Sequence, residues 1–182
     1  MKKILLAILL SILGFNANAQ QNKGDNLDNF GKIELGFHGL SFAYELPITN
    51  KFVWENAVGA GMGMSADNNS ATYSLDVVRP VPFIKSKLKF VYNINKRIEK
   101  EKNIRNNAGN YIALQTKYSF GRANHNTNNR SMLTELHWGI QRNLGGNFLF
   151  NTHVGLGYLG DFNSNNGAVS PTIGVSFGYR IF

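Results

Sequence analysis

The sequence predicts an all-β protein, an eight-stranded, antiparallel, up-and-down barrel with one short helical segment. Two observations lead to this fold class. Segments of roughly ten residues alternate between apolar and polar or small side chains, which is the spacing of β-strands. The chain of 182 residues also contains 19 glycines and no cysteine, so turn formers are frequent and thiol chemistry or a disulfide framework is excluded. This length fits a single domain.

The first residues have the pattern of an export signal. Lys2-Lys3 is followed by an apolar run over 4–15 and by Ala17-Asn18-Ala19, the order of a secretory leader. The apolar run is shorter than the ~18 to 20 residues of a membrane-spanning helix. No later run is longer, so a mature chain in a membrane must cross it with strands. The expected parts are a signal peptide over 1–19, a flexible segment over 20–30 and the barrel over 31–182.

Alternation is clearest in five segments. In one of them Ile112, Leu114 and Tyr118 share a face, while the residues between them are mostly polar or small. The same rule holds in the others, and so many matches are unlikely to arise by chance. The five predicted strands cover 52–64, 110–120, 132–140, 148–158 and 173–181.

A sixth strand is expected over 72–83, where Pro80 and Pro82 weaken its end. The connections between strands alternate between long, Asn-rich loops and short turns, as in outer-membrane barrels. The predicted long loops are Ser65–Ala71, Gly121–Arg130 and Gly160–Ser170, and the short turns are Pro47–Asn50 and Leu144–Gly146.

Residues 32–46 change phase in the middle. A turn at His38-Gly39 would give two strands that pair Phe37 with Leu40, whereas a bulge would give one long strand. We favour two strands because the total then becomes eight, and single-chain exported barrels have an even number.

Residues 84–107 interrupt this pattern with apolar residues at helical spacing among many basic ones. We expect a periplasmic helical segment that contacts anionic lipid or an envelope protein, or else a solvated connection. Nucleic acid is not an expected partner, because the chain is exported and the segment has few aromatic residues for stacking. The basic residues assigned to this segment are Lys85, Lys87, Lys89, Lys96, Arg97 and Lys100.

Alternation alone fits two kinds of barrel. A membrane barrel is apolar outside, whereas a soluble lipocalin-type barrel is apolar inside, around its ligand. The polar stripe here is rich in glycine and lightly charged, which suits a narrow interior. Aromatic residues lie towards the ends of the apolar stripes, as in the girdles at the two membrane interfaces. The sequence therefore favours the membrane barrel.

The chain ends on Val175-Ser176-Phe177-Gly178-Tyr179-Arg180-Ile181-Phe182. This strand resembles the terminal strand of small outer-membrane β-barrels, the OmpA/OmpX-like eight-stranded proteins and their PorT-like relatives. The resemblance implies a porin-like fold in the cell outer membrane of a Gram-negative bacterium, contact with its lipid, and insertion by the barrel-assembly machinery. The chain departs from the family in one respect, because Phe182 is one residue out of step with Phe177 and Tyr179.

The inward faces predict a filled interior. Eight strands enclose a space just wide enough for side chains, so a general diffusion pore is not expected. Charges in such a space must pair, because an isolated buried charge is very costly. Glu34 and Gln141 also face inward on this pattern. The residues assigned to an interior polar plug are Glu45, Glu55, Lys117, Glu135, His137, His153 and Arg180.

Two of these residues are the best candidates for a metal site. A loop centred on Gly145 would place His137 opposite His153 on the inner wall, with Glu135 as a diagonal neighbour. Imidazole and carboxylate ligands suit zinc, copper or nickel. The simpler interpretation is a histidine pair within the polar plug, and on it we expect neither a metal nor a cofactor.

The functional prediction is a non-enzymatic outer-membrane barrel with a structural, accessory or surface-interaction role. The alternatives are an accessory subunit of a secretion or envelope complex, a soluble carrier of a small apolar ligand, and an enzyme that modifies lipid A. An enzyme would need a nucleophile or base near the outer rim. The outward faces hold no histidine, and Ser65, Ser70, His125 and Ser131 show no recognisable spacing.

Overall fold

The computed structural model is a closed, all-β barrel with eight antiparallel strands in the order β1-β10-β9-β8-β7-β6-β3-β2. It describes residues 26–67, 70–74, 76, 78–121 and 129–182. Neighbouring barrel strands follow one another along the chain, with only the β4–β5 hairpin inserted between β3 and β6. The predicted closed, eight-stranded, up-and-down architecture is therefore confirmed. The barrel strands are β1 (Phe30–Gly36), β2 (Gly39–Pro47), β3 (Phe52–Gly61), β6 (Val81–Phe90), β7 (Gly109–Ser119), β8 (Ser131–Gly145), β9 (Phe148–Asp161) and β10 (Asn166–Arg180).

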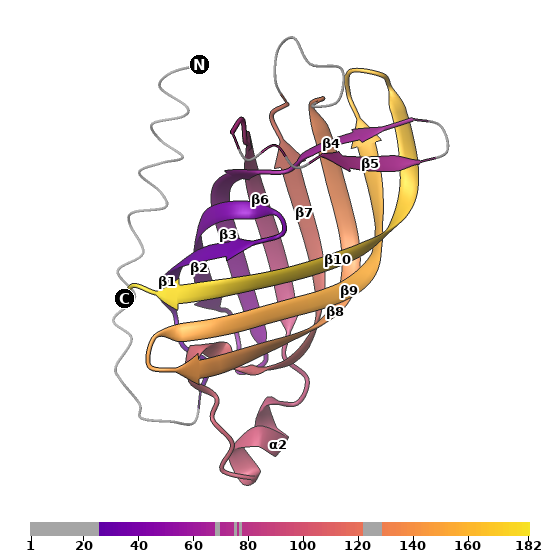
Figure 1. Ribbon diagram of the computed structural model, residues 1–182. Helices are drawn as coiled ribbons and strands as arrows, with labels where there is room; N and C mark the ends of the chain where they lie inside the picture. The colour runs from indigo at the N-terminus through magenta and orange to yellow at the C-terminus, as the bar shows by residue number, and fades with distance from the viewer. Residues whose placement is uncertain (1–25, 68–69, 75, 77, 122–128) are drawn as a thin grey trace, which may run out of the picture.

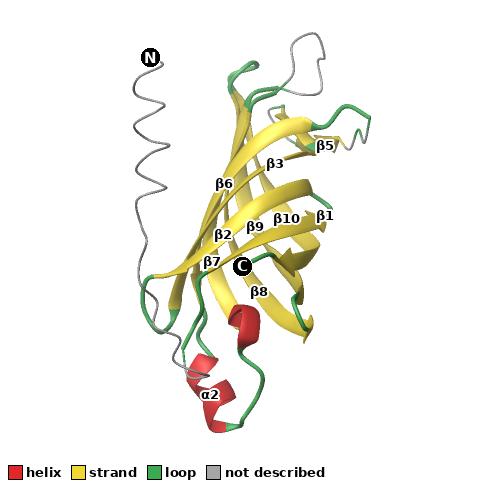
Figure 2. Cartoon of the chain, turned by 90° about the vertical axis from the view of Figure 1, so that its left-hand side faces the viewer, coloured by secondary structure: helices red, strands yellow, loops and turns green. Residues whose placement is uncertain are grey.

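Additional elements lie at both ends of the barrel (Figures 1 and 2). A hairpin of β4 (Gly63–Ala66) and β5 (Ala71–Ser74) crosses one end. The helix α2 (Ile94–Glu99) and the single turn η1 (Arg105–Asn107) lie at the other end, which we call the α2 end. No helix among the described residues is long and apolar enough to cross a membrane. The predicted signal peptide lies outside the described residues.

The first hairpin confirms that residues 32–46 form two strands, but with a different register. Leu35 lies opposite Leu40, whereas the predicted turn would have placed it opposite Phe42. Gly39 belongs to β2 and not to the turn, and its φ of 109° is one that glycine adopts readily. A Cβ at Gly39 would approach the Ala60 carbonyl oxygen to 2.2 Å, so the tight pairing with β3 also requires glycine.

The region between β3 and α2 differs most from the prediction. The expected strand over 72–83 does not form, because 71–74 belong to the β4–β5 hairpin and the barrel strand is β6. The two prolines lie before and at the start of this strand instead of at its end, a place where proline is tolerated. The expected helical segment begins ten residues later, at Ile94. The strand expected over 52–64 likewise stops at Gly61.

The last three strands are longer than predicted. The Asn-rich segment 160–170 is mostly strand, with only residues 162–165 between β9 and β10. Asp161 accepts backbone hydrogen bonds from Asn163 and Ser164 at 2.9 and 3.1 Å, which closes this turn tightly. Another predicted long loop, 121–130, lies largely outside the described residues.

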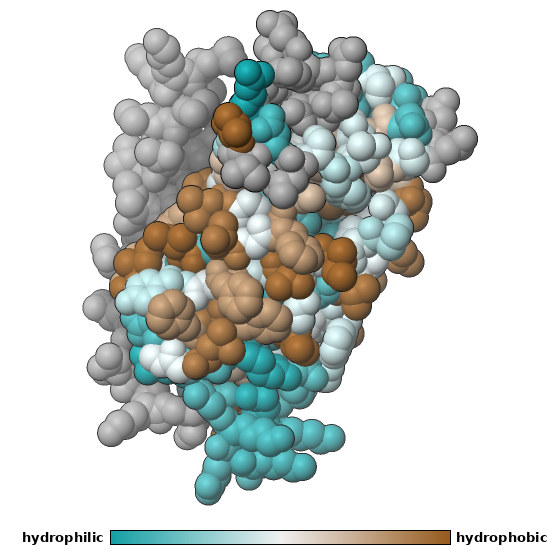
Figure 3. Space-filling view, viewed as in Figure 1, coloured by the Kyte–Doolittle hydropathy of each residue, from teal (hydrophilic) through white to brown (hydrophobic). Residues whose placement is uncertain are grey.

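The two faces of the wall differ sharply in polarity. The charged and most of the polar side chains of the strands point inward and are buried, whereas most of the large apolar side chains point outward and form the brown band of Figure 3. We call this band the apolar belt. Its members include Ile33, Leu35, Phe42, Trp54, Val58, Ile84, Leu88, Ile112, Leu114, Leu136, Trp138, Val154, Leu156, Ile173, Phe177 and Tyr179, each 40% or more exposed.

A small apolar cluster closes the α2 end. Ile94 of α2 packs with Val91, Val53 and Tyr111, and Leu27 joins them from the segment before β1. Of the segment 20–30, only residues 26–30 are described, and Leu27 and Phe30 are buried. The helix is therefore fixed to the barrel through its apolar side, which leaves Lys96 exposed, while Arg97 is half-buried and donates to the Asn103 carbonyl oxygen.

Candidate functional site: the barrel interior

The interior next to the α2 end holds a network of ion pairs, which we call the ionic cluster. Its side chains come from β1, β2, β3 and β6, where alternate residues point inward. Four ammonium groups and three carboxylates take part. The members are Lys32, Glu34, Glu45, Glu55, Lys85, Lys87 and Lys89.

Glu55 lies at the centre of the ionic cluster and is fully buried. Its Oε1 is 2.8 Å from Lys87 Nζ and 3.3 Å from Lys85 Nζ. Its Oε2 is 3.1 Å from Lys32 Nζ and 3.2 Å from Lys89 Nζ. One carboxylate thus contacts all four ammonium groups, and its removal would leave them facing one another.

Glu45 connects the ionic cluster to the α2 end. Its Oε1 lies 2.6 Å from Lys32 Nζ and 2.7 Å from Lys89 Nζ, and its Oε2 accepts a hydrogen bond of 2.8 Å from Asn107. Gln141 donates to the Asn106 carbonyl oxygen at 2.6 Å, next to the same carboxylate. Hydrogen bonds of Asn106 and Asn107 therefore connect the η1 turn to the ionic cluster.

Lys85, Lys87 and Lys89 correct the prediction of a basic periplasmic segment. They lie on β6 and point into the barrel, and Lys87 and Lys89 are only 3% and 1% exposed. The sequence contained a signal for this placement, because the three lysines alternate with Ile84, Ser86, Leu88 and Phe90. The same apolar positions also satisfy helical spacing, and this led to the wrong assignment.

The other three basic residues of that prediction lie where a helical segment was expected. Lys96 and Arg97 belong to the last turn of α2, and Lys100 caps its C-terminus. Lys96 and Lys100 are exposed. The α2 end of Figure 3 is correspondingly hydrophilic.

A second group of side chains lies deeper in the barrel. We call Glu135, His137, His153 and His38 the histidine cluster. His137 Nδ1 is 3.0 Å and His153 Nε2 is 3.5 Å from the same oxygen, Glu135 Oε1. The rings of His137 and His153 stack with centroids 4.1 Å apart, and His38 stacks on the other side of His153 at 6.1 Å. Gln115 donates to Glu135 Oε1 at 2.6 Å.

The register that brings the two histidines together is not the predicted one. His137 lies opposite Gly155, and His153 lies opposite Gly139, because the turn between β8 and β9 lies at residues 146–147 and is not centred on Gly145. The two histidines are still in contact, because a register shift of two residues keeps both side chains on the inner face. His137 and His153 are therefore diagonal neighbours instead of a directly opposed pair.

Several nitrogen atoms in this region lack a hydrogen bond. Within the described part of the chain no hydrogen-bond partner exists for His38 Nε2, His137 Nε2 or Lys117 Nζ, and His153 Nε2 has only Glu135 Oε1 at 3.5 Å. Lys117 is 2% exposed, and its ammonium group lies 4.4 Å from the centroid of the Phe83 ring. Buried polar atoms in proteins usually have partners, so such a concentration indicates bound water or a ligand.

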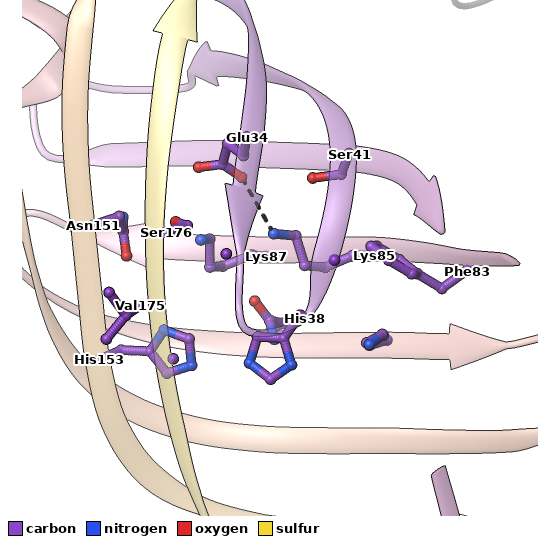
Figure 4. A pocket seen from close by; sticks show the side chains of 15 residues that line it. Glu34, His38, Ser41, Phe83, Lys85, Lys87, Asn151, His153, Val175 and Ser176 are labelled. Carbon is purple, nitrogen blue, oxygen red and sulfur yellow. Dashed lines mark ion pairs between the residues drawn. The ribbon is translucent and has the colours of Figure 1, made fainter. Parts of the chain in front are cut away.

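A small cavity borders the histidine cluster (Figure 4). Its volume of about 40 Å³ is enough for a few water molecules. His38 and His153 face it from one side, while Lys85 approaches from the other and forms an ion pair with Glu34 at 3.6 Å. Most of its lining is polar or charged, so it is suited to water or an ion.

The interior near the β4–β5 hairpin is apolar. Met64 and Ala66 of β4 pack against inward-facing Leu133, Leu159 and Ala168. Ser131 donates to the Met64 carbonyl oxygen at 3.1 Å, and Asp161 accepts from the Ala66 amide at 3.2 Å. The hairpin is therefore held inside this end of the barrel.

Arg180, a predicted member of the plug, lies at its edge. Its guanidinium contacts Asp28 at 3.3 Å and Asn106 at 3.4 Å, and the side chain is 21% exposed. Phe182 follows the end of β10 and is out of step with its alternation, but its side chain still lies on the outer face. Its ring lies directly over Gly31, where a Cβ would approach to 2.5 Å, and 6.3 Å from the Tyr44 ring.

Comparison with known proteins gives no further guide to the site. No family model, no curated protein and no solved structure matches this chain.

Proposed function

We propose that this protein is an outer-membrane β-barrel with a structural, accessory or surface-interaction role and without catalytic activity. The observation that carries the proposal is the apolar belt around a closed barrel with a charged interior. Monomeric soluble proteins rarely expose contiguous apolar patches of this extent. A lipid bilayer is the solvent that makes such a surface favourable.

The aromatic residues support the same proposal. At the α2 end, Phe52 packs on Phe90 at 4.9 Å and Phe148 on Tyr179 at 5.1 Å. At the opposite end, Tyr118 packs on Phe120 at 5.0 Å. Girdles of aromatic residues at both edges of an apolar band are typical of membrane barrels, because these rings favour the interface with water.

The distribution of polarity also argues against a soluble carrier. A lipocalin-type barrel needs an apolar interior for its ligand, whereas the middle of this barrel contains the ionic and histidine clusters. The side chains fill the lumen, so the proposed role does not include diffusion of solutes.

The α2 end would face the periplasm. Both ends of the barrel chain, at Phe30 and Arg180, lie there, together with the short turn between β8 and β9. Lys96, Arg97 and Lys100 would then be available to an anionic envelope partner or to lipid headgroups. This basic surface is what favours an accessory role within an envelope complex, while the barrel-assembly machinery would act during insertion.

Fractionation combined with gel mobility tests the proposal. The full-length protein is expressed in a Gram-negative host, and its membrane fraction is extracted with detergent and run unboiled and boiled. We expect a folded form that resists unboiled SDS and migrates differently from the boiled form. A periplasmic protein with one mobility would contradict the proposal and favour the soluble carrier. A carbonate wash of the membranes controls for peripheral attachment.

A further inference from the structure

We propose that Glu135, His137 and His153 bind a divalent transition-metal ion of the zinc class inside the barrel. Their three ligand atoms, one from each side chain, lie within 4.8 Å of one another. Two imidazole nitrogens and one carboxylate oxygen form a ligand set that zinc uses in proteins, with a fourth position left for water.

The unsatisfied nitrogens are the first argument. His137 is 2% exposed; its Nδ1 lies 3.0 Å from Glu135 Oε1, but its Nε2 has no hydrogen-bond partner in the described residues, and His153 Nε2 has only the same carboxylate oxygen at 3.5 Å. A neutral imidazole buried in this way has a lone pair without a donor. A metal ion would satisfy one lone pair on each ring, and Glu135 would supply the negative charge.

The second argument is the space that glycines provide around the rings. A Cβ at Gly174 would lie 2.1 Å from His153 Cε1, so this ring occupies room that only glycine leaves. A Cβ at Gly155 would lie 2.5 Å from the Cβ of His137. The rings are therefore placed by two rigid neighbouring strands and not by mobile loops.

Binding requires a small movement of the two rings. They are nearly parallel, at 23°, whereas lone pairs that point at one ion must converge. The cavity beside His153 gives that ring room to tilt, and it can also supply the water for the open position.

The charges around the site select the kind of ion. Only one carboxylate is present, so the oxygen-rich shell that calcium or magnesium needs is not available among the described residues. The positive charge of Lys87 acts electrostatically on His137, but its ammonium group is paired with Glu55 at 2.8 Å. A soft ion that favours nitrogen ligands fits this environment best.

The test uses the full chain without a histidine tag, folded in detergent and stripped of metal. Zinc is titrated calorimetrically, and cobalt is used as a spectroscopic probe for tetrahedral nitrogen and oxygen coordination. We expect one ion per chain, with binding at least tenfold weaker in His137→Ala and in His153→Ala. The isosteric variant Glu135→Gln should show the same loss while preserving the shape of the site.

His38→Ala is the matched control, because it removes a histidine of the same cavity that is outside the ligand set. We expect it to bind zinc within about threefold of the original chain, since it loses no ligand. The unboiled gel form verifies that each variant is folded. The proposal is wrong if the folded original chain takes up no zinc, or if the double variant His137→Ala/His153→Ala binds it equally well.

Discussion

Along β3, Glu55 points into the barrel and is fully buried, whereas its neighbour Trp54 points outward and is 45% exposed. The same contrast holds on β8. His137 points inward and is 2% exposed, whereas its neighbour Leu136 points outward and is 60% exposed. Soluble proteins place these residue types the other way round. The inner face is stable only if its charges are paired, and the outer face is stable only if its surroundings are apolar.

The largest expected effect comes from breaking the inner face at its centre. Glu55→Ala removes the carboxylate that contacts four ammonium groups, and loss of one partner of a buried ion pair costs about 3–5 kcal/mol. Urea unfolding in detergent, followed by the loss of the unboiled gel form, measures this effect. Glu99→Ala, at an exposed position on α2, is the control and should change the midpoint little. Equal stability of the two variants would mean that the ion pairs contribute nothing.

A charge on the outer face should cost nearly as much. Leu136 lies in the middle of the apolar belt, between Leu114 and Leu156 of the neighbouring strands. In a membrane, Leu136→Arg should lower the free energy of unfolding by about 2–4 kcal/mol, because a cation at the bilayer midplane is costly. Leu136→Ala is the matched control for lost packing. Unfolding measured in lipid vesicles distinguishes them, and a harmless arginine would indicate that this face meets water.

The smallest expected effect is an increase, not a decrease, in the stability of the barrel. Lys117 Nζ has no hydrogen bond or ion pair with any described residue and contacts only the Phe83 ring at 4.4 Å, so Lys117→Met removes a buried charge that no close carboxylate offsets. We expect unchanged or higher stability, by up to about 1 kcal/mol. In contrast, Lys32→Met should destabilise the barrel, because Lys32 contacts three carboxylates at 2.6 to 3.1 Å. If both lysine variants behave alike, pairing does not decide which inner charges stabilise the fold.

The sequence was sufficient for the fold class and the polarity of the two faces, because both follow from alternation. The number of barrel strands also needed the rule that such barrels have an even number, and one of the eight was placed at 72–83 instead of at Val81–Phe90. The register in which the strands pair was harder to predict. In both β1–β2 and β8–β9 the predicted pairing is wrong by two residues, a shift that leaves every side chain on its correct face. Alternation cannot detect such a shift, which is decided by the position of the turn in each hairpin, at residues 37–38 and 146–147.

The candidate site was predictable only in part for a related reason. Glu45, Glu55 and His137 lie on strands with clear alternation, so their inward direction follows from the sequence. The lysines of β6 alternate too, but helical spacing fits the same apolar positions and short apolar segments often satisfy both periods. The role of His38 depends on the β1–β2 turn, whose position the phase change did not determine.

The most direct test of the central claim uses the only two tryptophans of the chain. Trp54 and Trp138 both lie on the outer face, each 45% exposed, with their indole nitrogens donating to Ser86 and Tyr92 at 2.9 Å. The protein is folded into vesicles made with or without brominated phosphatidylcholine, and tryptophan emission is compared. The account predicts lower tryptophan emission in the brominated vesicles, because the rings touch lipid. Equal emission in both kinds of vesicle would show that the apolar belt does not face lipid, and would contradict the account.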